Sequence, residues 1–254
     1  MLADNNEQRL WYQKGVGQRL IQAESEQVTA FLPRLYGYHL VFLGDPGLIT
    51  LVQASLISHR IVVDPHQMSE HQAYSPLQGE MSAIPLRTDS VDVVVLSHVL
   101  EHVANPHDVL RETHRVLIPE GHVLITGFNP FSLWGIWHVI QKWLKAAPQP
   151  GKMLSAGRVR DWLTLLNFQI VGGQMFYFRP PINHEGICQK LNFMERWGAR
   201  WFSIFGGAYS ILAVKRVVPL TPVRAKFKIG KPIWEGVTEG IPKPSTTANQ
   251  SSHE

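Results

Sequence analysis

Hydrophobic and polar residues change their spacing several times along the chain, and each change predicts a new element. Between residues 8 and 32 the apolar positions recur at helical spacing, which predicts one or two helices. An apolar run at 38–44 then predicts a strand, the segment 48–58 a helix, and the run at 60–64 a second strand. A strand, a helix and a strand within about thirty residues form a βαβ unit, whose crossover is almost always right-handed.

The middle of the chain carries a run of β-branched residues at 91–96, which is typical of a strand buried on both faces. Asn105 followed by Pro106 predicts the start of a helix, because Asn caps helices well and Pro favours the first helical position. Further strands are expected at 122–128, 168–178 and 208–217, and a further helix at 159–166. This alternation predicts an α/β fold with a doubly wound, Rossmann-like and mostly parallel sheet.

Three segments of different composition divide the chain. Residues 1–35 are expected to form an N-terminal helical segment, residues 36–218 the main domain, and residues 219–254 a flexible tail. The tail is rich in Pro, Lys, Ser and Thr, so it has too little apolar surface to offset the entropy of ordering. We therefore expect the tail to be disordered.

Charge is distributed unevenly between the body and the tail. The chain has a formal net charge of +4, and residues 215–254 hold seven Lys or Arg against three acids. The residues before them carry seventeen basic and seventeen acidic side chains. A neutral body gives no support to a nucleic-acid groove across the domain, whereas the basic tail leaves nucleic acid open as a partner.

The remaining composition favours a cytoplasmic protein. A hydrophobic fraction of 44% in 254 residues is enough for one substantial core. The first ten residues lack the pattern of a signal peptide, and no run of about 18 apolar residues predicts a membrane span. Cys188 is the only cysteine, which excludes an internal disulfide and a cysteine-based metal cluster.

Candidate binding residues follow the first two predicted strands. In a doubly wound sheet, ligands bind outside the carboxyl ends of the strands. Gly44-Asp45-Pro46-Gly47 ends the first strand, so backbone amides there could face a ligand. Asp64 ends the second strand at a spacing that suits a ribose-binding acid. A tight turn and a solvated strand-end carboxylate are the alternatives.

The segment from Gly79 to Pro130 contains further features in a fixed order. They are Gly79-Glu80, Ile84-Pro85-Leu86, Asp89-Ser90-Val91-Asp92, Leu100-Glu101-His102 and the turn from Arg115 to Gly121. With these features the segment resembles the class I S-adenosylmethionine-dependent methyltransferases of the type-11 domain group. The resemblance extends over residues 36–216, and "GFNPFSLWG" with "DWLTLLNF" is similar to the YafS-like members from enterobacteria. It implies a Rossmann-like methyltransferase fold, S-adenosylmethionine as the cofactor and methyl transfer as the activity.

The resemblance also implies roles for individual residues. Glu80 would accept a hydrogen bond from the adenine amino group, and the backbone of Met81 would meet the ring nitrogens. Asp64 would hold the ribose hydroxyls, and the turn from Gly44 to Gly47 would pass under the methionine moiety. These roles suit the chemistry, because carboxylates accept from amines and hydroxyls while glycine permits close backbone approach. For each acid, a solvated surface carboxylate is the alternative.

One position departs from the family pattern. The family usually has an acid two residues before the first glycine of this turn, and here Phe42 occupies that position. Its usual Gly-x-Gly is also altered to Gly44-Asp45-Pro46-Gly47. Either Asp45 takes over the contact with the ammonium group of the methionine moiety, or that contact is lost.

The stretch "SHVLEHV", Ser97 to Val103, contains the spelling of an inverted zinc-protease helix motif. Such a motif needs a long helix, but Ser97 directly follows a strand and Pro106 begins the next helix, which leaves room for only a turn. We therefore expect no metal site. Ser97, as a cofactor-binding residue, and His98 are expected to line the cofactor and substrate cleft, while Glu101 and His102 shape the loop.

Methyl transfer itself requires alignment of the reactants and exclusion of water more than a protein nucleophile. If the acceptor is a hydroxyl or an amine, His98 is the predicted general base. A small-molecule acceptor is the leading expectation. A noncatalytic binding module and an RNA-modifying enzyme using the basic tail are the alternatives, and the oligomeric state is not predicted.

The aromatic-rich stretch 128–144 precedes the helix at 159–166. We interpret it as a lid over the substrate, and a helix that lies on a membrane surface is the alternative.

Overall fold

Residues 15–66, 72–144, 151–179 and 205–217 are described by the structure, which is a computed structural model. They belong to a unit that ends at Val217. The predicted tail, Cys188 and the first residues of the predicted N-terminal helix lie outside the described residues.

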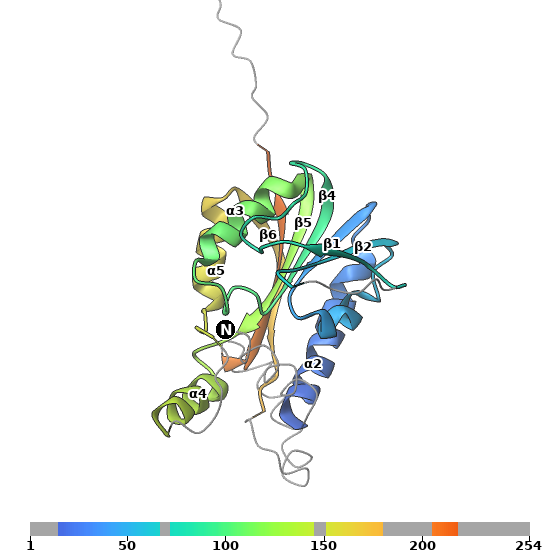
Figure 1. Ribbon diagram of the computed structural model, residues 1–254. Coiled ribbons are helices and arrows are strands. Elements are labelled where there is room, and N and C mark those ends of the chain that lie inside the picture. The colour runs from blue at the N-terminus through green and yellow to red at the C-terminus, as the bar shows by residue number, and fades with distance from the viewer. Residues whose placement is uncertain (1–14, 67–71, 145–150, 180–204, 218–254) are drawn as a thin grey trace, which may run out of the picture. The chain divides into compact units, whose positions relative to one another are not determined.

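A seven-stranded sheet forms the centre of the molecule (Figure 1). The strands are β1 (His39–Leu43), β2 (His59–Asp64), β3 (Ser75–Gln78), β4 (Val91–Ser97), β5 (Leu117–Phe128), β6 (Phe168–Phe176) and β7 (Ala208–Lys215). Their order is β3-β2-β1-β4-β5-β7-β6. Neighbouring strands from β3 to β5 pair in parallel, whereas β7 pairs antiparallel with both β5 and β6. The predicted doubly wound, mostly parallel sheet is confirmed.

Helices cover both faces of this sheet. The 17-residue helix α2 (Gly15–Phe31), η1 (Leu32–Arg34) and η2 (Pro46–Val52) pack on one face, while α3 (Pro106–Val116) and α5 (Ala156–Leu165) pack on the other. Alternating residues of β1 serve both cores, since Leu40 and Phe42 join the first and Val41 and Leu43 the second. One further helix, α4 (Leu133–Leu144), follows β5. None of the helices in the described part of the chain is long and apolar enough to cross a membrane.

The predicted helix at 48–58 is wrong in length and type. The chain forms only the seven-residue 3-10 helix η2, which begins at Pro46 and ends at Val52. The Ser55 hydroxyl then accepts a hydrogen bond from the Ile57 amide at 3.2 Å, and such a local bond competes with helix continuation. The short strand β3 had no counterpart in the prediction, because four residues that include Pro76 carry little periodic signal.

The two acids of the Asp89-Ser90-Val91-Asp92 segment lie at the amino ends of the parallel strands, whereas the predicted site lies at their carboxyl ends. Asp92 accepts hydrogen bonds from the amides of Tyr38 and His39, both at 2.9 Å, which fixes the start of β1 beside the start of β4. Lys215, at the end of β7, donates to the Asp89 carboxylate at 2.7 Å. These family-typical acids therefore stabilise the sheet and do not belong to a binding site.

Candidate functional site

Four of the predicted site residues lie in one row at the carboxyl ends of adjacent parallel strands. The register pairs Leu43 of β1 with Val63 of β2 and with Leu96 of β4. The residues that directly follow these three are Gly44, Asp64 and Ser97, respectively. They therefore lie side by side. Gln78 of β3 pairs with Asp64, so Gly79 and Glu80 extend the row beyond β2. Three strand spacings give the row a length of about 14 Å, which suits an elongated ligand.

The turn after β1 passes very close to β4. Gly44 has a φ of +151°, and a β-carbon on this residue would lie 2.7 Å from the carbonyl oxygen of Ser97. Only glycine fits there, so the backbone at this point stays unobstructed by a side chain.

Asp45 has a local structural role in the same turn. Its Oδ1 accepts a hydrogen bond from the Gly47 amide at 2.8 Å and caps η2. Phe42, at the position where the family usually has an acid, is fully buried against the face covered by α2 and η2. The expected contact of Asp45 with an ammonium group remains a prediction, and its capping bond is the role that the structure describes.

The two carboxylates assigned to the adenosine moiety differ in exposure. Asp64 is buried, and its Oδ1 accepts from the His66 amide at 2.7 Å and lies 2.9 Å from His66 Nδ1. Glu80 is exposed, and its carbonyl oxygen accepts from the Ala83 amide at 3.0 Å in a tight turn. The Gly79 amide donates to the Asp64 carbonyl at 3.0 Å, which ties the two acid-bearing segments together.

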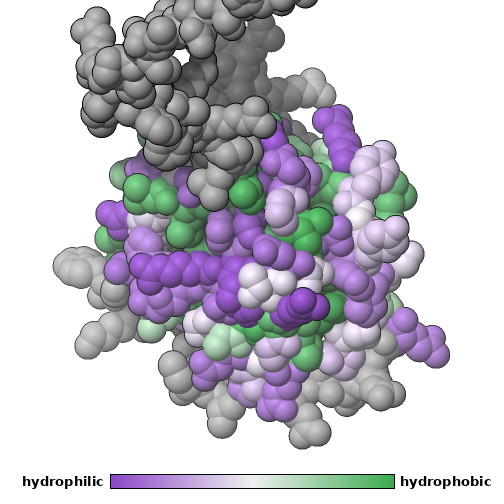
Figure 2. Space-filling model, turned by 90° about the horizontal axis from the view of Figure 1, so that it is seen from above, coloured by the Kyte–Doolittle hydropathy of each residue, from purple (hydrophilic) through white to green (hydrophobic). Residues whose placement is uncertain are grey.

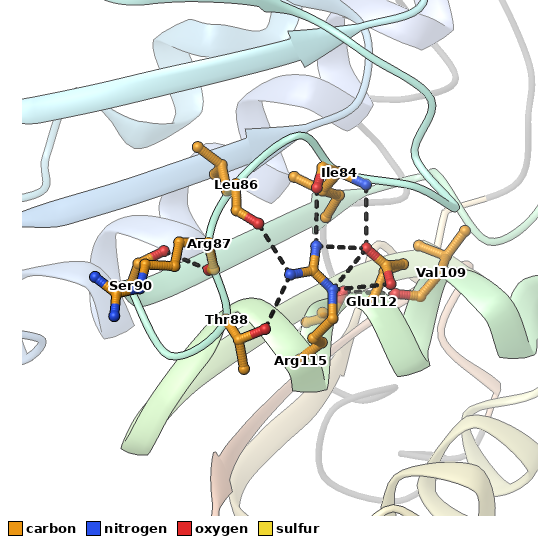
Figure 3. Close-up of polar contacts among 9 residues, drawn as sticks. Ile84, Leu86, Arg87, Thr88, Ser90, Val109, Glu112 and Arg115 are labelled. Carbon is orange, nitrogen blue, oxygen red and sulfur yellow. Dashed lines mark hydrogen bonds and ion pairs between the residues drawn. The ribbon is translucent and has the colours of Figure 1, made fainter.

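Arg115 of α3 holds the loop that follows Glu80 and Met81 (Figure 3). Its guanidinium donates to the carbonyl oxygens of Ile84 and Leu86, both at 2.9 Å. The Glu112 carboxylate pairs with Arg115 at 2.8 Å and accepts from the Ile84 amide at 3.2 Å. The hydrogen bond and charge of Arg115 lower the pKa of Glu112. Two segments of the family resemblance, Ile84-Pro85-Leu86 and the Arg115 turn, are therefore one interacting unit.

A buried ionic cluster lies beside the row, at the ends of β4 and β5. His98 is placed between two carboxylates, with Nε2 3.3 Å from Glu24 and Nδ1 3.3 Å from Glu101. The other Glu24 oxygen accepts from the hydroxyls of Ser97, at 3.1 Å, and of Thr126. Glu24 comes from α2, so this N-terminal helix contributes directly to the site.

The second carboxylate of the cluster supports the end of β5. Glu101 accepts a hydrogen bond from the Phe128 amide, and the ring of Phe128 lies 4.4 Å from that of His98. Burial raises the pKa of the neighbouring Tyr209, and the charge of Glu101 raises it further. The expectation that Glu101 shapes the loop agrees with these contacts, although its carboxylate is also part of the cluster.

The cluster determines the protonation of His98. Burial alone would lower the pKa of this imidazole, but the charges of Glu24 and Glu101 outweigh burial and raise the pKa to about 10. Burial alone would raise the pKa of Glu24, and the charge of His98 together with the hydroxyl hydrogen bonds lowers it instead. A protonated imidazole with a carboxylate at each nitrogen cannot accept a proton, so the geometry does not support His98 as the general base.

Ser97 ends β4, and the segment 98–103 that follows it forms turns and bends and not a helix, as expected. His98 is buried, whereas His102 is exposed, so the two histidines do not converge in the manner of a zinc-protease motif. Among the described residues, no group of three His, Cys, Asp or Glu side chains has the arrangement of a metal site.

Glu24 is the site residue that the sequence did not reveal. It lies on the apolar stripe of α2 between Leu20 and Val28, each four positions away, and all three are fully buried. An acid on the apolar face of a helix is a signal of a buried polar contact. The sequence could have shown that Glu24 needs a partner, but not that His98 is that partner.

Comparison with known proteins agrees with the class of protein that this fold defines. A family model described as a methyltransferase domain matches residues 46–125. Among solved structures, an S-adenosylmethionine-dependent methyltransferase from Thermotoga maritima superposes with a TM-score of 0.60 at 18% identity. The match covers 83% of this chain and 95% of the other. The chain thus has the Rossmann-like methyltransferase fold.

The relatives in sequence are more specific. The uncharacterized protein YafS of Escherichia coli (strain K12) is 31% identical over 211 residues, which cover 83% of this chain and 82% of YafS. The ubiquinone/menaquinone biosynthesis C-methyltransferase UbiE of Cereibacter sphaeroides is 27% identical over 88 residues, 33% of this chain and 34% of UbiE. The chain belongs to the type-11 group of S-adenosylmethionine-dependent methyltransferases, and within it to the YafS-like proteins.

Proposed function

We propose that the protein transfers the methyl group of S-adenosylmethionine to a small-molecule acceptor. The observation that carries this proposal is the row formed by Gly44, Asp64 and Glu80 at the carboxyl ends of three adjacent strands. In a doubly wound sheet this edge is where nucleotide-like ligands bind.

The residues of the row match the chemistry of the cofactor. Asp64 and Glu80 supply acceptor oxygens for ribose hydroxyls and for an adenine amino group, respectively. The absence of a side chain at Gly44 allows a ligand to lie directly on the backbone of the turn. When bound, S-adenosylmethionine supplies a methyl group on a positively charged sulfur.

The buried cluster supports the same proposal through its charge. Two carboxylates, Glu24 and Glu101, surround one imidazolium, His98, so the cluster carries one net negative charge. A negative charge in a buried environment stabilises a nearby positive group more strongly than it would in water. These side chains orient and stabilise reactants, and no protein base is required for acceptors that are already nucleophilic.

Calorimetric titration with S-adenosylhomocysteine tests the binding assignments. Asp64→Ala and Glu80→Ala should each weaken binding by about ten- to a hundredfold, as expected for loss of a charge-assisted hydrogen bond. Asp161→Ala, which removes an exposed acid on α5, is the matched control and should leave binding unchanged. Failure of the folded wild-type protein to bind at millimolar ligand would disprove the proposal.

A pair of substitutions separates the two roles of Asp45. Asn can still accept the hydrogen bond from the Gly47 amide, whereas Ala cannot. If Asp45 only caps η2, Asp45→Asn should bind S-adenosylhomocysteine like the wild type and Asp45→Ala more weakly. If its charge holds an ammonium group, both variants should lose affinity.

A noncatalytic binding module is the second candidate. It is favoured by the short η2 and by the engagement of Asp45 within its own turn, which both depart from the family pattern. This candidate predicts a folded protein that binds neither S-adenosylmethionine nor S-adenosylhomocysteine, so the same titration distinguishes the two.

A further inference from the structure

The helix α4 exposes an unusually large apolar surface. In the described part of the chain, thirteen large hydrophobic residues are more than a third exposed. Six of these thirteen lie between residues 131 and 140. Leu133, Ile136, Trp137 and Ile140 follow the spacing of a single helical face, with exposed fractions of 43%, 59%, 44% and 43%. A contiguous apolar patch of this kind marks an interaction surface, because isolated exposed hydrophobic residues are the usual pattern.

The attachment of α4 to the body does not use this face. Trp134 points the other way, is buried against Phe128 and Tyr177, and donates to the Arg179 carbonyl at 3.0 Å. Ser132 fixes the first turn by accepting from the Gly135 amide at 3.2 Å. The helix is therefore held in place by Trp134 and Ser132, while its four apolar residues are exposed in the part of the chain that the structure describes.

The location of α4 separates it from the hydrophilic end of the molecule. It projects from the end of the sheet at which β5 terminates (Figure 1). The opposite end, viewed in Figure 2, has mainly hydrophilic residues among its described part, with hydrophobic residues in small separate groups. Among the described residues, the largest group of exposed hydrophobic side chains along the sequence is therefore the one at 131–140.

The chain from the end of β5 to the start of α5 is basic in sequence, and Asp161 follows it directly. Residues 121–160 contain five Lys or Arg and no Asp or Glu: Lys142, Lys145, Lys152, Arg158 and Arg160. Arg158 lies in the first turn of α5, and because α5 precedes a strand parallel to β5, this turn lies at the same end of the sheet as α4. An exposed apolar helical face within a basic stretch of the chain suits the surface of an anionic bilayer.

We propose that α4 binds the surface of a membrane containing anionic lipids, with Ile136 and Trp137 inserted below the headgroups. A second copy of this chain fits less well, because a symmetric contact through α4 would place the same cations against one another. The proposal goes beyond methyl transfer and stands whether or not the chain is an active enzyme.

Flotation with lipid vesicles tests the proposal on the full chain. The wild type should float with phosphatidylcholine vesicles containing phosphatidylglycerol and bind at least about tenfold more weakly to pure phosphatidylcholine, and added salt should weaken the anionic binding. Ile136→Glu and Trp137→Glu should each lower the binding constant by about tenfold or more. Leu165→Glu is the matched control, because Leu165 is 79% exposed on α5, and it should leave binding unchanged.

Four outcomes would overturn the proposal. Equal binding by the wild type and both α4 variants would assign membrane binding to another basic segment, and no binding by the wild type would exclude it. A dimer in solution that Trp137→Glu converts to a monomer would identify a second copy as the occupant. A large fall in melting temperature for Ile136→Glu but not for Leu165→Glu would show that the face packs within the chain itself.

Discussion

Three ionised side chains, Glu24, His98 and Glu101, meet in the interior with almost no exposure to solvent. Burying such a group costs desolvation energy that mutual attraction does not fully recover. Apolar residues of the same volume would often stabilise the fold as well or better. The cluster is therefore better explained by the electrostatics of the site than by stability alone.

Removal of one charge from the cluster should nevertheless be strongly destabilising. Glu24→Gln removes the carboxylate that faces His98 Nε2 and accepts from the Ser97 and Thr126 hydroxyls, and we expect the free energy of unfolding to fall by about 3–5 kcal/mol. Glu26→Gln is the control, since Glu26 is exposed two positions away on the same helix, and it should change the value by less than about 0.5 kcal/mol. Denaturant titration of the three proteins measures both effects.

The same cluster predicts a pH dependence of stability. The pKa of His98 is raised in the folded protein, so its stabilisation is complete below about 6.5 and is lost as the pH rises towards about 10. The pKa of Glu24 is lowered, so its stabilisation is present above the unfolded value of 4.5 and is lost at lower pH. Stability should therefore decline above neutral pH, and less steeply in His98→Gln. An equal decline in both proteins would contradict this assignment.

At the scale of elements, α3 and the loop between β3 and β4 act as one piece. Arg115 bonds two carbonyl oxygens of that loop, and the loop begins with the Glu80 turn. Arg115 does not itself reach the row of binding residues through any described contact. It is a positioning residue, and its effect on binding should be indirect.

Arg115→Lys tests this indirect effect. Lysine keeps the charge but cannot donate in the planar fork, so the loop should become more mobile and S-adenosylhomocysteine binding weaker by about three- to tenfold. Hydrogen exchange of amides 79–88 should accelerate in parallel. Arg111→Lys provides the control, because Arg111 is largely exposed and pairs with Asp108 on its own helix. Slower exchange or unchanged affinity in Arg115→Lys would contradict the positioning role.

The elements differ in how far the sequence could predict them. The strands at 91–96 and 122–128 were predictable because continuous β-branched and apolar runs fit a strand buried on both faces. The helix expected at 48–58 was not realised: a 3-10 helix ends at Val52, and the Ser55 hydroxyl then accepts a local hydrogen bond from the Ile57 amide. Asp64 and Glu80 could be selected from spacing and resemblance, whereas Glu24 depends on a contact 74 positions away, which spacing does not encode.

At the scale of the whole molecule, the described residues form one sheet with a core on each face, and its last strand is β7. The chain beyond Val218 is basic and poor in apolar residues, so we propose that it contributes little to the stability of the domain.

Removal of residues 219–254 tests this division. We expect the melting temperature to change by less than about 2–4 °C, which corresponds to about 1 kcal/mol, and S-adenosylhomocysteine affinity to stay the same. A chain ending before Ala208 is the contrasting variant, because it lacks β7 and should not fold cooperatively. A large fall in melting temperature for the first truncation would show that the tail packs on the body.

The placement of β7 between β5 and β6 also has a consequence in time. The ribosome completes β5 before it has made the strand that covers its free edge, and 79 residues, from Asn129 to Gly207, must be added in between. At 5–20 residues per second this interval lasts roughly 4–16 s. During that interval the β5 edge is a template for unwanted pairing with other chains. A newly made chain therefore depends on protection by its surroundings until its last strand emerges.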